Sequence, residues 1–309
     1  MHCRSIVWLS CLAGAALGAS QQPVTPLSPE VKAGTTIKVA PHTYVIPDNN
    51  VPLVPNVGIV VGSRATLVID PGLGTKNGET VAREVTAVSR NAEVFVAATH
   101  FHAEHTTGAM AFPAAKYVAS RIQQEEFAAS GSQQIQSFSA RSAETAAFLK
   151  GAGIPKAAIT FDRSYALDLG GVHVRLMVVG PTHTKGDTGL FVQEDAVLFS
   201  GDVVMNNSFL AANASSSMRA WLAAFDTFEA LGAKVVVPSH GTVGDGPLVA
   251  ANRALVTEIR TRTLALKAQG RSSNQAAASV HDALVAEHPN WARATGIDAL
   301  AASAYAEAQ

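Results

Sequence analysis

A cluster of three histidines and one glutamate within six consecutive positions most constrains what this chain can fold into. Its members are His100, His102, Glu104 and His105. The apolar stretch Val94–Ala98 directly precedes them and predicts a buried strand, which places the cluster in a loop at a sheet edge. In a loop these side chains can converge on one point, which a regular helix or strand does not allow at this spacing. Imidazole and carboxylate groups hold zinc or iron, so the cluster predicts a metal site.

Further candidate ligands occur downstream, each where an apolar run ends. His183 follows a run of valines, Asp202 follows Val197–Gly201, and His240 comes shortly after a third run of valines. Each stands near a glycine or proline, which interrupts regular structure. Taken alone, Asp202 is typical of a turn and His240 of a helix cap. Their order along the chain favours the interpretation that they are ligands gathered over one sheet edge.

These residues resemble the pattern of the metallo-β-lactamase superfamily. The pattern is His-x-His-x-Glu-His at 100–105, followed by His183, Asp202 and His240 in that order. The resemblance covers about residues 36 to 270. It implies an α/β fold, a four-layer αββα sandwich of two mixed sheets with a metal pair at the sheet edges. The order of predicted elements agrees, because strands and helices recur in two similar halves that suit two packed sheets with helices outside.

The resemblance also implies how the ligands divide between two zinc ions. The set implied for the first ion is His100, His102 and His183. The set implied for the second ion is Glu104, His105 and His240, with Asp202 as the bridge. The family usually has aspartate where Glu104 stands, and the extra methylene adds about 1.5 Å of reach. Occupancy of the second site, and zinc rather than iron as the metal, are therefore left open by the sequence.

Two metals about 4 Å apart can bind a hydroxide that attacks a carbonyl, phosphoryl or sulfuryl centre. A carboxylate beside them can orient the nucleophile or carry a proton to the leaving group. Glu104 and Asp202 are therefore the candidate catalytic residues. Asp70, at the end of an earlier strand, would fix a histidine tautomer or the loop. Lys185 could contact an anionic substrate group or simply be solvated.

We expect an exported zinc-dependent hydrolase that uses a metal-bound hydroxide on a small-molecule substrate. The bond cleaved would be an ester, lactone, amide or β-lactam bond. One alternative is a mononuclear iron enzyme resembling the persulfide dioxygenases, since the superfamily includes such proteins. Another is a non-catalytic periplasmic protein that binds or relays metal. The sequence does not indicate the oligomeric state.

The first residues predict an export signal. The apolar stretch Ile6–Ala19 is shorter than the ~20 residues that span a bilayer, and small residues allow cleavage after Gly18 or Ser20. We therefore expect a periplasmic or secreted protein with no stable membrane anchor. Cys3 and Cys11 both fall within the signal, so the mature chain would have no disulfide and no thiolate ligand.

Beyond the signal, we expect a loose segment over 21–35 and a single domain over 36–309. Within the domain, an Ala- and Gln-rich stretch predicts a helical insert at about 119–151 with a break at Gly131. The C-terminal region, about 247–309, predicts helices. The formal net charge is −1, so the chain lacks the excess of positive charge that binds a phosphate backbone. We therefore expect no nucleic acid partner.

Overall fold

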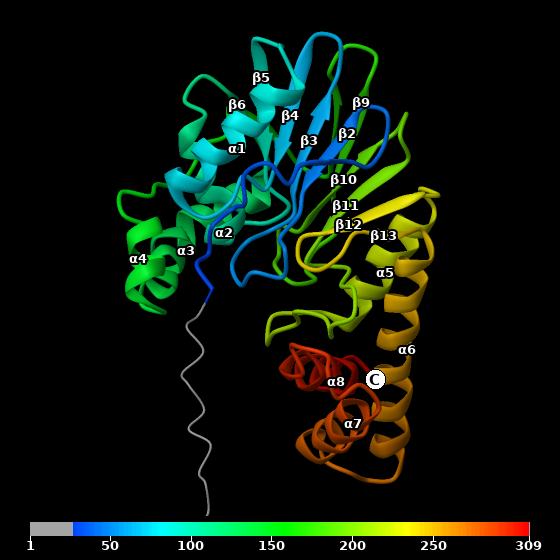
Figure 1. The fold of residues 1–309 in the computed structure, drawn as a ribbon. Coiled ribbons are helices and arrows are strands. Elements are labelled where there is room, and N and C mark those ends of the chain that lie inside the picture. Colours follow the sequence, from blue (N-terminus) through cyan, green and yellow to red (C-terminus); the bar gives the residue numbers. More distant parts are fainter. Residues whose placement is uncertain (1–26, 309) are drawn as a thin grey trace, which may run out of the picture.

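Two β-sheets packed face to face form the centre of the molecule, and helices cover their outer faces (Figure 1). The structure is a computed structural model that describes residues 27–308. The sheets contain seven and six strands, in the orders β1-β2-β3-β4-β5-β6-β7 and β13-β12-β11-β10-β9-β8. This confirms the predicted α/β sandwich of two mixed sheets.

The seven-stranded sheet is antiparallel from β1 to β4 and parallel from β4 to β7. Its strands are β1 (Ile37–Lys38), β2 (Thr43–Ile46), β3 (Val57–Val61), β4 (Ala65–Ile69), β5 (Glu93–Ala97), β6 (Lys116–Ser120) and β7 (Ile159–Phe161). Every residue of β4 is buried, as expected for a central strand that is covered on both faces. Because β4 and β5 run parallel, their carboxyl ends deliver Asp70 and the histidine loop to the same edge.

The six-stranded sheet is antiparallel except for the parallel pair β11 and β12. Its strands are β8 (Ser164–Asp168), β9 (His173–Val178), β10 (Thr188–Val192), β11 (Val197–Gly201), β12 (Val235–Pro238) and β13 (Gly244–Asp245). The parallel pair brings Asp202 and His240 together, since each residue follows the carboxyl end of its strand.

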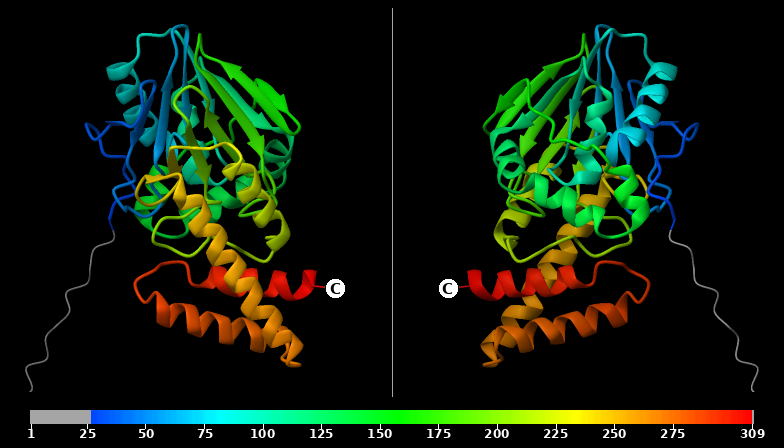
Figure 2. Two further views of the ribbon diagram at one scale, coloured as in Figure 1. Left: turned by 90° about the vertical axis from the view of Figure 1, so that its right-hand side faces the viewer. Right: turned by 90° about the vertical axis from the view of Figure 1, so that its left-hand side faces the viewer.

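The helices differ in what they cover. They are α1 (Gly74–Val88), α2 (Ala103–Thr106), α3 (Arg121–Ser139), α4 (Ala143–Phe148), α5 (Met218–Glu229), α6 (Pro247–Ala268), α7 (Ser273–Glu287) and α8 (Thr295–Glu307). A 3-10 turn, Thr107–Ala111, follows α2. Figure 2 shows α7 and α8 beyond one end of the sandwich, where they pack on the long helix α6.

Three apolar layers hold these elements together. Leu67 and Phe199 belong to the layer between the sheets, and Val81 of α1 packs on the outer face of the first sheet. On the outer face of the second sheet, Trp221 and Phe225 of α5 are fully buried. Burying a large apolar side chain contributes about 1.5–3 kcal/mol, so these layers fix the sheets against each other.

The prediction for residues 119–151 was wrong in two details. Residues 116–120 form β6, which pairs with β5 and β7, so the helical segment begins at Arg121. The predicted break at Gly131 is absent, because α3 runs through it. A Cβ added to Gly131 would come within 2.6 Å of Ile154 Cδ1, so this glycine allows close packing rather than a break.

The predicted export signal and both cysteines lie outside the described residues. Among residues 27–308, no helix combines the length and the apolar character needed to cross a bilayer.

Candidate metal centre

The predicted ligands come from four loops, each following a strand. His100 and His102 follow β5, and His102 has extended backbone angles (φ −62°, ψ 151°) immediately before α2, which carries Glu104 and His105. His183 lies between β9 and β10. Among residues 27–308, the ligand atoms fall into three groups whose members lie within 4.8 Å of one another. These groups are His100–His102–His183, His100–His105–Asp202 and Glu104–His105–His240.

Asp202 can reach the other ligands because of the glycine before it. Gly201 has φ of +63°, and a Cβ at this position would meet Thr99 Cβ at 3.0 Å. Glycine therefore lets β11 end against the loop that carries the first histidines. The result is that two sheets contribute ligands to one cluster.

The first trio has the spacing of a tetrahedral site. His102 Nδ1 lies 3.1 Å from His100 Nε2 and 3.1 Å from His183 Nε2. Zinc–nitrogen bonds of about 2.0–2.1 Å at the tetrahedral angle separate nitrogens by about 3.3 Å. These imidazoles therefore fit a single metal ion without rearrangement.

The second trio is looser, and Asp202 connects it to the first. Glu104 Oε1 lies 3.9 Å from His105 Nε2. Asp202 directs one oxygen to each trio, since its Oδ2 is 3.6 Å from His183 Nε2 and its Oδ1 is 3.9 Å from His240 Nε2. Glu104 therefore reaches the second trio despite its additional methylene, and Asp202 has the geometry of a bridge.

Unpartnered buried atoms support a metal at the second trio. Glu104 Oε2, His105 Nε2 and Asp202 Oδ1 are buried and have no hydrogen-bond partner among the described residues. Leaving a buried polar atom unsatisfied costs about 1–3 kcal/mol, and more for a charged group. A cation would satisfy all three atoms. The nitrogen and oxygen donors suit zinc or iron, so the residues present fit the metal that the fold implies.

The protonation of most histidines suits metal binding. Burial holds the pKa values of His100 and His102 well below 6.5, and burial lowers the pKa of His240 to about 4 despite the nearby Asp202 carboxylate. These imidazoles are therefore neutral at pH 7, which is the form that coordinates metals. Burial opposes ionisation of Asp202, but His240 and His183 outweigh it and keep the pKa of this carboxyl below its usual range.

His105 and Glu104 depart from that pattern. Burial favours neutral His105, but the charge and hydrogen bond of Asp70 outweigh it and raise the pKa of His105 to about 9. Burial also raises the pKa of Glu104. A metal at the second trio must therefore displace the proton of His105, and its charge would favour the ionised form of Glu104.

Asp70 links two of the ligand-bearing loops, the one after β5 and the one after β12. Its Oδ1 accepts from the backbone N–H of Thr99 at 2.7 Å, and its Oδ2 accepts from Thr99 Oγ1 at 2.8 Å. The same Oδ2 accepts from Ser239 Oγ at 2.9 Å and from His105 Nδ1 at 3.0 Å. Thr99 precedes His100 in sequence, and Ser239 comes directly before the last histidine ligand. One buried carboxylate therefore orients both sheet edges.

The remaining imidazoles are oriented by neighbouring oxygens. His240 Nδ1 donates to Val54 O at 3.0 Å, and His183 Nδ1 donates to Ala211 O. His100 Nδ1 lies 3.1 Å from Thr99 Oγ1. Each contact leaves Nε2 free to face the cluster, because a ring nitrogen that donates outward cannot also coordinate.

Sequence reasoning missed several of these contacts. Nothing in the sequence indicated that Thr99 and Ser239 donate to Asp70, because a threonine or serine beside a histidine is common in loops. Lys185 does not approach the metal cluster through any described contact. Its side chain is exposed, and its backbone N–H donates to Glu126 Oε1 at 2.9 Å.

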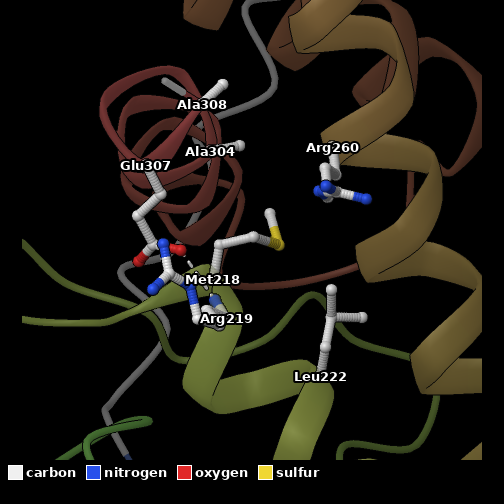
Figure 3. Close-up of a pocket in the computed structure, with 7 residues that line it drawn as sticks. All are labelled: Met218, Arg219, Leu222, Arg260, Ala304, Glu307 and Ala308. Carbon is white, nitrogen blue, oxygen red and sulfur yellow. Dashed lines mark hydrogen bonds between the residues drawn. The ribbon is translucent and has the colours of Figure 1, made fainter.

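A cavity lies elsewhere, between α5, α6 and α8 (Figure 3). Its volume is about 210 Å³, and none of the predicted ligands lines it. Its walls are Met218, Arg219, Leu222, Arg260, Ala304, Glu307 and Ala308. This cavity is therefore separate from the metal cluster.

Comparisons with known proteins agree with the observed fold. A family model described as the metallo-beta-lactamase superfamily matches residues 50–240. No curated protein matches the chain. Among solved structures, a metallo-beta-lactamase from Pontibacter korlensis is 20% identical with a TM-score of 0.58, and the match covers 72% of this chain and 98% of that one.

Two other solved structures cover more of this chain. The stereoselective inverting sec-alkylsulfatase Pisa1 from a Pseudomonas species is 15% identical with a TM-score of 0.61, and the match covers 88% of this chain but 50% of that chain. A metallo-beta-lactamase family protein from Thermus thermophilus is 17% identical with a TM-score of 0.58, covering 87% of this chain and 94% of that one. At these identities the likeness shows a shared fold.

Proposed function

Because this chain belongs to the metallo-beta-lactamase superfamily, we propose that it is a zinc-dependent hydrolase that cleaves an ester, lactone, amide or β-lactam bond of a small molecule. One observation carries the proposal. Two ligand trios face each other, and a single buried carboxylate, Asp202, directs one oxygen to each. This arrangement suits two metal ions that share a substrate.

In this proposal, His100, His102 and His183 hold the first zinc ion. Glu104, His105 and His240 would hold the second, and Asp202, with one oxygen toward each trio, would hold both. When bound, the ions would supply Lewis acidity and lower the pKa of water at the site to near neutrality. The chain contributes the fixed orientation of each imidazole, which keeps the ligands converged before a metal or substrate arrives.

The two carboxylates of the cluster, Glu104 and Asp202, would have different roles. Glu104 Oε2 is buried and free of hydrogen bonds among the described residues, and burial raises the pKa of this carboxyl. Where Glu104 does not coordinate the second metal, its carboxylate can instead accept a proton from the nucleophile and return it to the leaving group. Asp202 remains ionised, because its pKa is lowered, and serves to hold the cluster together.

The second trio favours this function over a mononuclear iron enzyme. One metal needs three or four protein ligands, whereas the described residues bring seven candidate side chains together. Buried His105 Nε2 and Glu104 Oε2 would also remain unsatisfied if only the first site were filled.

The test is metal quantification followed by a substrate panel on the same sample. We expect about two zinc ions per chain and turnover of at least one of an aryl ester, a lactone, an amide and nitrocefin. Turnover should stop with a chelator and return with zinc. Loaded protein that turns over none of these would support a non-catalytic protein, and iron with oxygen uptake on persulfides would support the dioxygenase alternative.

We further propose that the protein acts in the periplasm or outside the cell, on the basis of the apolar stretch Ile6–Ala19. N-terminal sequencing of protein recovered from a periplasmic fraction should find a start after Gly18 or Ser20. Recovery of the uncleaved chain from the cytoplasm would contradict export and leave the hydrolase proposal unaffected.

A further inference from the structure

Helix α3 is bonded to the loop that carries His183, residues 179–187. Glu126, near the start of this helix, is half-buried, and its two carboxylate oxygens accept from two consecutive backbone N–H groups of the loop. Its Oε1 accepts from Lys185 at 2.9 Å, and its Oε2 accepts from Gly186 at 2.8 Å. Hydrogen bonds to an ionised acceptor are roughly twice as strong as neutral ones. One side chain therefore anchors the loop shortly after the ligand.

Gly186 lets the loop approach the helix this closely. A Cβ added to this residue would lie 2.8 Å from both Gln123 N and Glu126 Oε2, and 2.9 Å from Gln123 Cα. Any side chain here would push the loop away from α3, because two of these three atoms belong to the helix backbone. Gly186 and Glu126 therefore act together: the glycine permits the close approach, and the carboxylate bonds the loop in that position.

The same end of α3 also contacts the loop that supplies the other two histidines of the first trio. Gln123 is fully buried, and its Nε2 donates to Ala98 O at 3.1 Å, two residues before His100. Phe127 packs edge-on against Phe101, the residue directly after His100, with ring centroids 6.1 Å apart. Among residues 27–308, no hydrogen bond joins α3 to α2 or to the loop after β12, which carry the second trio. The polar contacts of α3 are therefore directed to the first trio.

Two other sets of bonds hold the His183 loop, and neither attaches it to α3. Asp187 accepts from the hydroxyl groups of two threonines within the loop, which braces the loop internally. Asn213 Nδ2 donates to His183 O at 2.7 Å, which attaches the loop to the segment that follows β11 in the second sheet. Glu126 is therefore the side chain that ties the loop to the helix beside the other two histidines.

We propose that Glu126 is a positioning residue of the first metal site. It holds the His183 loop against α3, so that His183 Nε2 stays within reach of the imidazoles of His100 and His102. The proposal rests on the metal sites of the function given above and adds a residue that acts through the backbone of a ligand loop. When only a fraction of the molecules holds His183 in reach, the apparent affinity for the first metal falls by that fraction.

The first measurement needs no metal. Hydrogen exchange of the chelator-treated chain, followed by mass spectrometry, reports the protection of the amides of Lys185 and Gly186. Glu126→Gln keeps one acceptor oxygen for these two N–H groups, and Glu126→Ala keeps none. We expect exchange to accelerate from wild type to Gln to Ala, by about 10-fold or more in the alanine variant, which loses both hydrogen bonds to a charged group. Unchanged exchange would overturn the proposal.

The second measurement is a titration with cobalt(II), whose visible absorption reports the geometry of its ligands. The binding step that disappears in His102→Ala is assigned to the first trio. We expect Glu126→Ala to weaken that step by about 10-fold and the other step by less than about 3-fold, since residues that orient metal ligands typically contribute about 10–100-fold. Glu126→Gln should recover part of the loss.

Gln124→Ala is the matched control. Gln124 lies on the same helix, and its Oε1 accepts from the backbone N–H of Ala157 at 3.1 Å, in a loop that carries no metal ligand. This variant therefore loses the same kind of contact between α3 and a loop. We expect it to lower the melting temperature as Glu126→Ala does, and to leave both cobalt steps unchanged.

Equal weakening of both steps in Glu126→Ala, or equal effects of Glu126→Ala and Gln124→Ala on the first step, would indicate a purely structural contact and overturn the proposal. Neither measurement involves turnover, so a substrate panel without cleavage leaves the result standing. A wild-type chain that binds no cobalt would contradict the metal centre itself and this proposal with it. A wild type with two normal steps that Glu126→Ala leaves unchanged would reject the role of Glu126 alone.

Discussion

Asp70 Oδ2 accepts a hydrogen bond from His105 Nδ1 at 3.0 Å, and both side chains are almost completely buried. Asp70 has φ of +53°, which turns the chain sharply at the end of β4 and directs the carboxylate into the cluster. The same carboxylate holds Thr99 and Ser239, which come immediately before His100 and His240. One residue of the first sheet therefore sets the orientation of ligands from both sheets.

Replacing Asp70 by asparagine should weaken metal binding without removing a ligand. The amide keeps the size of the side chain but loses the charge and part of the capacity to accept hydrogen bonds. We expect zinc affinity to fall by about 10–100-fold, the usual cost of losing a partner of a metal ligand. Competition with a chromophoric chelator measures this. Asp162→Asn, at an exposed ion pair with Arg121, is the control, and equal affinities in the two variants would contradict the role of Asp70.

Removing the imidazole of His102 should abolish the first metal site. Its Nδ1 lies 3.1 Å from both other nitrogens of the first trio, so no nearby group can replace it. We expect zinc content to fall by about one ion per chain and activity to fall by more than the ~100-fold upper range for supporting residues. His281→Ala is the control, since His281 pairs with Asp298 on the C-terminal helices. Wild-type activity in His102→Ala, with circular dichroism showing an intact fold, would refute its assignment.

Glu104→Gln should affect the second metal selectively. The amide has nearly the size of the carboxylate, but it is neutral and a poorer metal ligand. Zinc titration should show the first binding step unchanged and the second weakened by at least about 10-fold. The exposed Glu125 on α3 provides Glu125→Gln as a control. A second step that matches the wild type would show that Glu104 does not coordinate.

The metal-free protein should be most stable near pH 6.5. Burial lowers the pKa values of His100, His102 and His240, so below pH 6.5 the unfolded chain takes up protons that the folded chain does not. Each of these histidines then costs up to about 1.4 kcal/mol per pH unit. His105 acts in the opposite direction: its folded pKa is raised to about 9, so its contribution is complete below about 6.5 and is lost as the pH rises toward 9.

Thermal unfolding of chelator-treated protein between about pH 5 and 9 measures this profile. His240→Gln should flatten the acid side, and Asp70→Asn should flatten the alkaline side, because without the Asp70 charge the pKa of His105 returns toward its ordinary value. A melting temperature that rises steadily across the range, or falls steadily, would contradict these assignments.

Much of the fold followed from patterns of apolar residues. The apolar stretch Val94–Ala98 predicted a buried strand, and β5 (Glu93–Ala97) lies within one residue of those bounds. Strands β6 and β7 were missed, because β6 passes directly into α3 and β7 has only three residues. The break predicted at Gly131 was wrong for a different reason. Local propensity cannot report that Ile154, distant in sequence, lies against that glycine.

The sequence by itself determined which side chains could meet. Imidazoles and carboxylates that follow successive strands gather at one edge of the sheets, and such a set is typical of a metal site. Only the tertiary structure decided how they are used. Sheet pairing placed Asp202 between the trios, and Asp70 set the protonation of His105. These features depend on distances across the fold, on burial and on charge, and a linear order of residues specifies none of them.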